Sequence, residues 1–315
     1  MQILLYEEWM KPQVISLFVA EYGVTFDEFE ELFTRFYESP FQKDHCVRIV
    51  AVEGEKVGGF QSFFYWPIKK DGVVYKTFQS GNSLVHPDFR GKGLFAKMLD
   101  FIHLPENQIE VDGLIGFPVE MSYGSFMRNK WKNPFNLQWH VKIAQPISSL
   151  FSNPERDLTK AFGKRSPVSV EPFMDFYFVT QSAEFDAYRF QFQQTPHWRY
   201  VYEEGSRRCL FEFKMQVRKK LIKELVIGKI VANDNETAFW QRAYDAFFKE
   251  VKRATSVTII SFACNGKIDY LQKLMADNGF RKIDRTIYFI AKGKMANEIE
   301  NWDNWDIQRA DIDTW

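Results

Sequence analysis

The chain has 315 residues, a length at which two domains of ordinary size are expected. Its 41 Lys and Arg residues match its 41 Asp and Glu residues, so the zero net charge argues against nucleic acid as the main partner. The three cysteines lie far apart without a CxxC pair, which argues against a disulfide framework and against a metal site.

The N-terminal segment and the hydropathy pattern bear on the location of the protein. Glu7 and Glu8 stand where a signal peptide would carry basic residues. No stretch approaches the ~20 consecutive apolar residues that a membrane span needs. We therefore expect a cytoplasmic protein that does not cross a membrane.

The first third of the chain predicts a helical segment followed by strands. Residues 10–38 carry apolar side chains at helical spacing. Two β-rich runs beginning at Cys46 and Val57 flank an EGEK turn, and the Asp-Gly turn of KKDG precedes a third run, 73–85. Gly81 inside this third run indicates a bulge or a close backbone approach.

The stretch VHPDFRGKGLF, residues 85–95, joins the third run to a helix. Free N–H groups and the positive dipole end at a helix N-terminus form an anion site. Gly91 and Gly93 permit a close backbone approach, and Arg90 and Lys92 add the positive charge that suits a pyrophosphate. For RGKG in isolation, a solvated basic turn is the alternative. The helix is predicted from apolar residues at helical spacing: Leu94, Phe95, Met98, Leu99 and Ile102.

The order of elements around this loop resembles that of the GNAT superfamily of acyl-CoA-dependent N-acetyltransferases. A strand, 111–119, and a short helix, 122–131, follow the first helix. The signature of the superfamily, Arg/Gln-x-x-Gly-x-Gly/Ala, reads here Arg90-Gly91-Lys92-Gly93-Leu94-Phe95, with Phe95 in place of the small residue. The resemblance implies an α/β fold with a mixed sheet, and acetyl-CoA as co-substrate without a metal.

The resemblance also implies where the cofactor binds. The pyrophosphate would lie on the six residues of the signature, and the pantetheine arm would pair with Ser83, Leu84 and Val85 like an added strand. This strand and the next would splay apart to open a slot. A backbone N–H near Leu84 or Val85 would stabilise the oxyanion of the tetrahedral intermediate.

Two residues are candidates for the proton transfers. The tyrosine that protonates the leaving thiolate in the superfamily falls here on Phe126, so Tyr123, one helical turn earlier, is the substitute. Glu120, at the end of the second strand, is the candidate general base. The alternatives are a packed core tyrosine for Tyr123 and a solvated carboxylate at a helix N-terminus for Glu120.

The second half of the chain repeats the first in outline. Strand, helix, strand, helix and strand are predicted in that order from residue 223 to residue 293. Val85 and Trp131 lie 46 positions apart, and Val231 and Phe280 lie 49 apart, which is typical of a duplicated unit. Where RGKG should recur there is ANDNET, whose acidic residues would repel a diphosphate.

We therefore predict two tandem GNAT-like domains and a tail. They are an acyl-CoA-binding domain over 1–145, a degenerate domain over 146–295 without the pyrophosphate loop, and an acidic, aromatic tail over 296–315. The tail could dock for stability, or it could line a sugar site with its tryptophans and aspartates: Trp302, Trp305, Trp315, Asp303, Asp306, Asp311 and Asp313.

The tandem layout, the FPVEMSYGSF segment and the tail are similar to bacterial GNAT-like proteins linked to surface-polysaccharide synthesis. This resemblance implies an N-acetyltransferase that acts on the primary amine of an amino sugar or sugar nucleotide. A peptide or protein N-acyltransferase and a non-catalytic CoA-binding protein are the alternatives. The basic run 218–220 could touch a membrane surface or a phosphorylated substrate, or it could be a solvated strand end. A homo-oligomer is left open.

Overall fold

The computed structural model describes residues 1–315 except 164–168, 174, 192–195, 220, 299–302 and 314. Trp302 and Lys220 therefore lie outside the described residues. The first half contains β1 (Gln2–Leu5), α1 (Lys11–Tyr22), α2 (Phe26–Tyr37), β2 (Val47–Glu53), β3 (Lys56–Tyr65), β4 (Ile68–Lys70), β5 (Val73–Tyr75), β6 (Thr77–Val85), α3 (Leu94–Phe101), β7 (Gly113–Gly116), α4 (Glu120–Arg128) and β8 (Lys132–Ile143). The second half contains α5 (Pro146–Ser149), α6 (Pro154–Phe162), β9 (Tyr177–Val179), α7 (Ala183–Phe190), β10 (His197–Glu204), β11 (Arg207–Arg218), β12 (Ile222–Ala232), α8 (Thr237–Ala254), β13 (Ile259–Asn265), α9 (Asp269–Asp277), β14 (Arg281–Lys292), α10 (Lys294–Glu298), β15 (Trp305–Asp306) and the 3₁₀ turn η4 (Arg309–Asp311).

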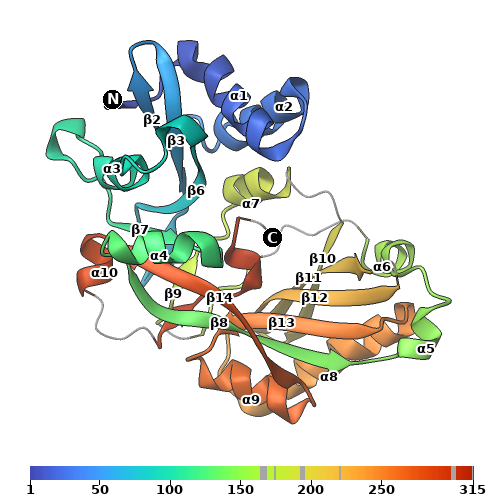
Figure 1. Ribbon diagram of the computed structural model, residues 1–315. Coiled ribbons are helices and arrows are strands. Elements are labelled where there is room, and N and C mark those ends of the chain that lie inside the picture. Colours follow the sequence, from blue (N-terminus) through green and yellow to red (C-terminus); the bar gives the residue numbers. More distant parts are fainter. Residues whose placement is uncertain (164–168, 174, 192–195, 220, 299–302, 314) are drawn as a thin grey trace.

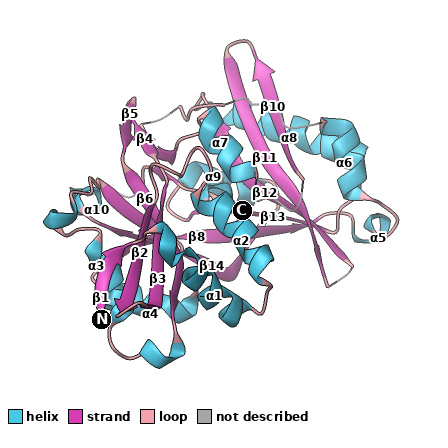
Figure 2. Cartoon of the chain, turned by 90° about the horizontal axis from the view of Figure 1, so that it is seen from above, coloured by secondary structure: helices cyan, strands magenta, loops and turns pink. Residues whose placement is uncertain are grey.

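One mixed sheet runs through both halves of the molecule (Figure 1). Among the described residues it has eleven strands, in the order β1-β2-β3-β6-β7-β14-β8-β13-β12-β11-β10. A smaller sheet contains β15, β9, β4 and β5. Seen from above, the β10–β11 hairpin reaches away from the first half (Figure 2). The expected α/β fold with a mixed sheet is confirmed.

The two halves share the middle of this sheet. In the first half β6 and β7 are parallel and are connected through α3, and in the second half β12 and β13 are parallel and are connected through α8. The two halves exchange their long strands β8 and β14. The strand β8 of the first half pairs with β13 of the second half, and β14 of the second half lies between β7 and β8. The sheet is thus continuous across residue 145, where the domain boundary stays a prediction.

Helices cover both faces of the first half of the sheet. Phe60 and Phe64 of β3 share a core with α1 and α2, whereas Phe63 shares another core with α3 and α4. This division follows from the period of two along a strand, which sends successive side chains to opposite faces. A separate core joins α8 and α9 to β11, β12 and β13. No helix among the described residues is both long and apolar enough to cross a membrane.

Local chemistry corrects three boundaries that the sequence predicts. The helical segment 10–38 is two helices, because Gly23 ends α1 with φ +67° and Thr25 caps α2 in a capping box with Glu28. The run 73–85 is interrupted between β5 and β6. The strand 111–119 shrinks to β7, and α4 begins already at Glu120.

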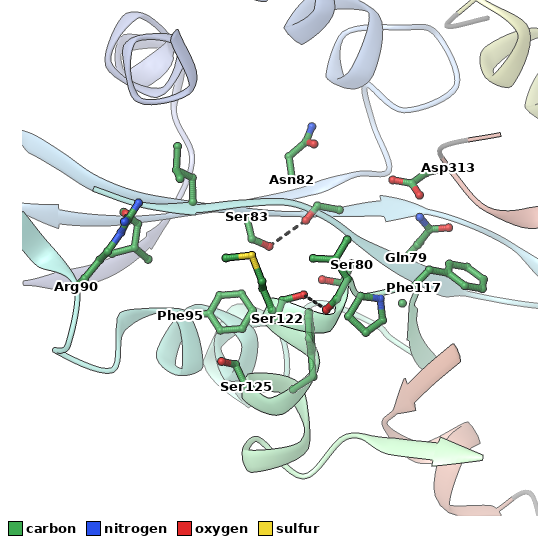
Figure 3. Close-up of a pocket in the computed structure, with 18 residues that line it drawn as sticks. Gln79, Ser80, Asn82, Ser83, Arg90, Phe95, Phe117, Ser122, Ser125 and Asp313 are labelled. Atoms are coloured by element: carbon green, nitrogen blue, oxygen red, sulfur yellow. Dashed lines mark hydrogen bonds between the residues drawn. The ribbon is translucent and has the colours of Figure 1, made fainter. Parts of the chain in front are cut away.

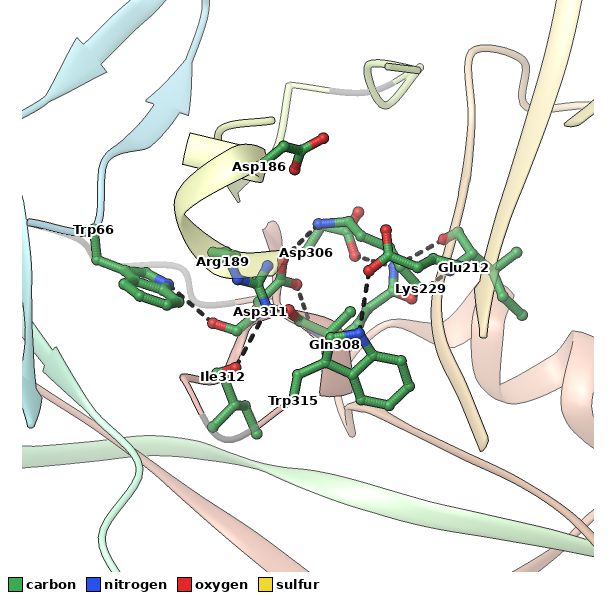
Figure 4. Close-up of polar contacts among 12 residues, drawn as sticks. Trp66, Asp186, Arg189, Glu212, Lys229, Asp306, Gln308, Asp311, Ile312 and Trp315 are labelled. Atoms are coloured by element: carbon green, nitrogen blue, oxygen red, sulfur yellow. Dashed lines mark hydrogen bonds and ion pairs between the residues drawn. The ribbon is translucent and has the colours of Figure 1, made fainter. Parts of the chain in front are cut away.

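The C-terminal tail lies between the two halves and fills a gap in the second one (Figure 4). The parallel pairing of β12 with β13 ends at Ile227 and Phe262. Beyond it, the Gln308 side chain accepts from the Ile230 N–H at 2.7 Å and donates to the Ile230 carbonyl at 2.8 Å. On the other side, the Asn265 N–H donates to the Ile307 carbonyl at 2.8 Å. The tail thus takes the place of a strand between β12 and β13.

Candidate functional site

A cavity of about 650 Å³ opens where β6 and β7 separate. The parallel pairing joins Thr77–Gln79 to Gly113–Ile115 and stops there, so residues 80–85 have no strand beside them on that edge. We call this space the strand cavity. It is lined by residues 79–85, Arg90, Phe95, residues 116–119, Met121, Ser122, Ser125, Phe126 and Asp313. Figure 3 shows Arg90 and Asp313 at opposite ends of it.

A bulge shapes the β6 side of the strand cavity. In the register with β3, Gln61 lies opposite Ser83 and Phe63 lies opposite Ser80. Gly81 and Asn82 of β6 therefore share the single residue Ser62 of β3. A Cβ on Gly81 would lie 2.1 Å from the Phe64 ring, so no larger residue fits without movement. The bulge or close approach that the sequence predicts at Gly81 is confirmed.

Backbone groups of β6 are exposed to the strand cavity. The His86 N–H donates to the Gly58 carbonyl on β3 at 2.9 Å. Because backbone groups alternate in direction along an antiparallel strand, the N–H and C=O of Val85 and Ser83 point to the opposite edge. Consistently, Arg90 Nε donates to the Val85 carbonyl at 3.0 Å from that edge. An extended ligand could therefore pair with Val85 and Ser83.

The glycine loop supplies a second cavity of about 340 Å³, here the loop cavity. Gly91 and Gly93 have φ values of +79° and +69°, in the left-handed region that favours glycine. The first i→i−4 bond of α3 runs from the Lys97 N–H to the Gly93 carbonyl, so the preceding N–H groups of the first turn have no partner within the helix. The two cavities share four lining residues: Val85, Arg90, Phe95 and Ser125.

Positive side chains surround the loop cavity unevenly. Arg90 lines it and also pairs with Glu21, at 3.1 Å. Lys92 is exposed and is not among the lining residues of either cavity; its Nζ lies 5.0 Å from the centroid of the Phe89 ring. Arg128 of α4 lines the cavity from the other side and donates to Ser125 Oγ at 2.9 Å. Arg128 could not be predicted from the sequence, because nothing in the motif connects it to the loop.

Phe95, which stands where the signature has a small residue, packs against Phe126 of α4. Its ring meets that of Phe126 edge-on, with centroids 5.3 Å apart. Both rings line the strand cavity. The bulky residue thus forms the wall between α3 and α4 and leaves the loop cavity open beside it.

The two predicted proton-transfer residues do not line the strand or the loop cavity. The Tyr123 hydroxyl donates to Asn133 Oδ1 at 3.2 Å, and its ring stacks on that of Tyr288 with centroids 4.2 Å apart. Glu120 is exposed and lines a different cavity, of about 550 Å³, which lies between the two halves. Their catalytic roles remain predictions.

Other groups in the strand cavity can carry a proton. Asp313 is the one carboxylate among its described lining residues, and it arrives from the tail, more than two hundred positions after β6. Ser122, on the cavity face of α4, donates to the Val119 carbonyl at 3.1 Å. The sequence made Asp313 a candidate for a sugar site in the tail, but it did not place Asp313 beside β6 or point to Ser122, because only the fold brings the tail and this helix face to the cavity.

The second half carries acidic residues at the place of the glycine loop. Glu236 precedes α8 and forms ion pairs with Arg207 and Arg242. Asp234 accepts the Glu236 N–H at 2.8 Å. Carboxylates at this point oppose an incoming diphosphate. No group of three His, Cys, Asp or Glu side chains in the described part of the chain could hold a metal ion.

Comparison with solved structures identifies the architecture. A probable N-acyltransferase of unknown function from Enterococcus faecalis V583 superposes with a TM-score of 0.62 at 13% identity, over 93% of this chain and 73% of that one. A GCN5-related N-acetyltransferase from Anabaena variabilis gives a TM-score of 0.60 at 10% identity, over 92% and 72% of the two chains. The chain has the GNAT fold.

A second GCN5-related N-acetyltransferase, from Kribbella flavida, gives a TM-score of 0.58 at 10% identity, over 94% of this chain and 72% of that one. The GNAT fold therefore spans both halves of the chain. No protein-family model and no curated protein sequence matches the chain.

Proposed function

We propose that the protein transfers an acyl group, acetyl in the simplest case, from acyl-CoA to a primary amine. One observation carries the proposal: the loop cavity and the strand cavity adjoin, because both are lined by Val85, Arg90, Phe95 and Ser125. A diphosphate on the N-terminus of α3 can thus continue into an arm that runs along the free edge of β6. The residues proposed for the cofactor are Ser83, Leu84, Val85, Arg90, Gly91, Lys92, Gly93, Leu94 and Phe95.

The proposed reaction is a direct transfer. The amine nitrogen attacks the thioester carbonyl carbon, the C–N bond forms, and the C–S bond breaks with CoA leaving as a thiolate that takes up a proton. The Val85 N–H, which points into the strand cavity, is placed to stabilise the oxyanion. No covalent bond to the protein is required.

The proton transfers have two candidate pairs. We propose Asp313 as the group that accepts the proton of the amine and Ser122 as a hydroxyl that can donate to the thiolate, since both line the strand cavity. Glu120 and Tyr123 are the pair proposed from the sequence. Glu120 could act from the 550 Å³ cavity, which shares the wall 117–119 with the strand cavity.

The proposed acceptor is an amino sugar, as the resemblance to polysaccharide-linked proteins implies. The tail supports a site for a polar acceptor at the end of the strand cavity away from Arg90, because Asp313 lies there with Gln79 (Figure 3). Carboxylate and amide groups suit the ammonium and hydroxyl groups of such a molecule.

Calorimetry with acetyl-CoA, followed by a thiol-release assay with amino sugars and with peptides, tests the proposal. We expect binding of acetyl-CoA and release of thiol with an amino sugar. Release with peptides alone would move the acceptor to the peptide class. Binding without release for any amine would favour a non-catalytic CoA-binding protein, and the absence of binding would refute the proposal.

A further inference from the structure

The cavity of about 550 Å³ between the two halves, here called the polar cavity, is not used by the proposed cofactor site. Its walls come from the loop 117–120, from β8, β11, β12 and β14, and from the tail. It shares residues 117–119 with the strand cavity. The consecutive tail residues Ile312 and Asp313 face the polar and the strand cavity, respectively. The two cavities are therefore neighbours.

Positive side chains dominate this cavity. Lys214, Arg218, Arg285 and Arg309 line it, against the two carboxylates Glu120 and Asp284. Lys214, Gln216 and Arg218 follow one face of β11, because side chains two apart on a strand point the same way. On the opposite face of β11, Phe213 and Met215 are buried in the core of the second half.

Two of these cations are held close together by an aromatic ring. Lys214 Nζ lies 4.3 Å and the Arg309 guanidinium carbon 5.6 Å from the centroid of the Trp315 ring. Burial and the nearby Arg309 lower the pKa of Lys214 to about 8, and burial lowers the pKa of Arg309 to about 10. The carboxylates Glu212 and Asp313 act on Lys214 and Arg309, respectively, in the opposite direction, and do not outweigh these effects. Neighbouring charges of the same sign repel each other in a partly desolvated place, and a bound anion would relieve that repulsion.

The other two cations, Arg218 and Arg285, differ in how far a carboxylate of the protein balances their charge. Arg218 is engaged with Glu224, so its charge is largely balanced within the protein. Arg285 is exposed, and its guanidinium carbon lies 4.8 Å from the centroid of the Trp139 ring. Stacking on an aromatic face orients a guanidinium without using its N–H donors. Those donors match the oxygens of a phosphate.

We infer that the polar cavity binds a phosphate or diphosphate group through Lys214, Arg285 and Arg309. Given the proposed function, on which this assignment of a substrate class rests, the group belongs to the acceptor. A molecule held by its phosphate in the polar cavity would extend its amine along residues 117–119, which line both cavities, toward Asp313 in the strand cavity. The acceptor is then an amine that carries a phosphate.

A titration with inorganic pyrophosphate tests the site itself. The protein is first saturated with CoA, so that the loop cavity is occupied and the polar cavity stays free. We expect binding in the wild type and an affinity at least about tenfold lower in Lys214→Met and in Arg285→Gln, because each removes one charged contact. Arg285 is exposed, so its replacement leaves folding intact even if the Lys214 variant is unstable.

The matched control is Arg253→Gln, which removes an equal charge from a side chain that is 80% exposed on α8. Its affinity for pyrophosphate should equal that of the wild type. Absence of pyrophosphate binding, or equal affinity in the wild type and Arg285→Gln, would overturn the inference. If CoA itself fails to bind, the proposed function is wrong. The anion site is then still tested by two variants: pyrophosphate binding that is lost in Arg285→Gln and kept in Gly93→Val would assign the anion to the polar cavity.

Kinetics distinguish a phosphate on the acceptor from a free anion. With glucosamine 6-phosphate and glucosamine as amines in the thiol-release assay, we expect at least a tenfold lower KM for the phosphorylated amine. Arg285→Gln should remove that difference and leave the affinity for CoA unchanged. Equal KM values for the two amines in the wild type would refute the acceptor assignment and leave pyrophosphate as a free ligand of the cavity.

Discussion

Gly91 and Gly93 determine the shape of the loop before α3, because both adopt left-handed backbone angles. A Cβ on either glycine would meet no atom within 4 Å. A larger residue in place of either glycine would thus strain the backbone and keep a ligand from approaching it closely, but it would not clash with other parts of the protein. The charges of Arg90 and Lys92 are secondary to this geometry.

We expect Gly93→Val to abolish the binding of acetyl-CoA measured by calorimetry. A β-branched residue is strained at φ +69° and covers the N–H groups at the start of α3. Gly205→Val is the matched control, since Gly205 has φ +65° in the β10–β11 hairpin and also an open environment. Unchanged affinity in Gly93→Val would place the cofactor elsewhere.

Asp313 is expected to act in turnover and not in cofactor binding. Asp313→Asn should lower kcat by roughly 10²-fold, because an amide cannot accept the proton of the amine. The affinity for acetyl-CoA should stay as in the wild type. Glu120→Gln in the same assay decides between the two candidates: a loss confined to Glu120→Gln would restore the role predicted from the sequence.

Asp306 is a buried carboxyl group inside the tail. Burial raises its pKa to about 6, while Lys229 and a hydrogen bond from Gln308 act in the opposite direction. Between about pH 4 and pH 6 the folded protein therefore holds a proton that the unfolded chain releases. The free energy of unfolding falls as the pH rises through this window.

Asp306→Asn should remove this pH dependence while keeping an oxygen acceptor for Gln308. The free energy of unfolding of the variant, relative to the wild type, should rise by roughly 2 kcal/mol from pH 4 to pH 7. Denaturant titrations at several pH values measure the difference. Parallel stability curves for the two proteins would show that Asp306 is ionised in the folded state throughout.

At the scale of elements, the tail is the piece that joins the two halves. Lys229 of β12 donates to Asp311 at 2.7 Å, with both side chains at most 3% exposed. The Trp66 indole N–H, from the first half, donates to the Asp311 carbonyl at 2.9 Å. The Trp315 indole N–H donates to Glu212 at 3.1 Å (Figure 4). These bonds hold the segment that presents Asp313.

Asp311→Ala should destabilise the protein by about 3–5 kcal/mol, because it leaves the Lys229 ammonium buried without its carboxylate. The double variant Lys229→Met with Asp311→Leu should recover much of the loss, since neither member of this pair is then left as a buried charge without its partner. Asp303→Ala removes an exposed carboxylate paired with Lys267 and should cost less than about 1 kcal/mol. Thermal or denaturant unfolding measures all three, and equal losses for Asp303→Ala and Asp311→Ala would contradict the buried-pair argument.

For the whole molecule, the exchanged strands β8 and β14 make the two halves one continuous sheet with two parallel strand pairs. The gap beside the first pair is the strand cavity, whereas the gap beside the second contains Ile307 and Gln308 of the tail. Of these two gaps, only the one beside β6 and β7 is thus open to the extended arm of a ligand.

We therefore expect one CoA to bind per chain. The acidic residues before α8 and the tail between β12 and β13 both oppose a second site. Calorimetry of the wild type should give a stoichiometry near one, and Gly93→Val should lose all binding and not half of it. Two equivalent sites would refute this interpretation of the second half.

The α/β fold and the glycine loop could be predicted from the sequence alone. Alternating and helical periods follow from local backbone geometry, and left-handed glycines before a helix are a local requirement of the turn. For the same reason the bulge at Gly81 and the loss of the loop in the second half could be predicted. The GNAT resemblance rested on these local features, which explains why it holds while the boundaries of α1 and β7 did not.

Only the tertiary structure decided which side chains meet in the cavities. Asp313 and Arg128 reach the strand and loop cavities from distant segments, and no spacing in the sequence connects them to the motif. The same is true of Lys214 and Arg309, which meet on the Trp315 ring because β11 and the tail are packed together. Local patterns report backbone conformation, whereas a binding site depends on contacts between segments far apart in the chain, and those are set by the burial of apolar surface in the whole fold.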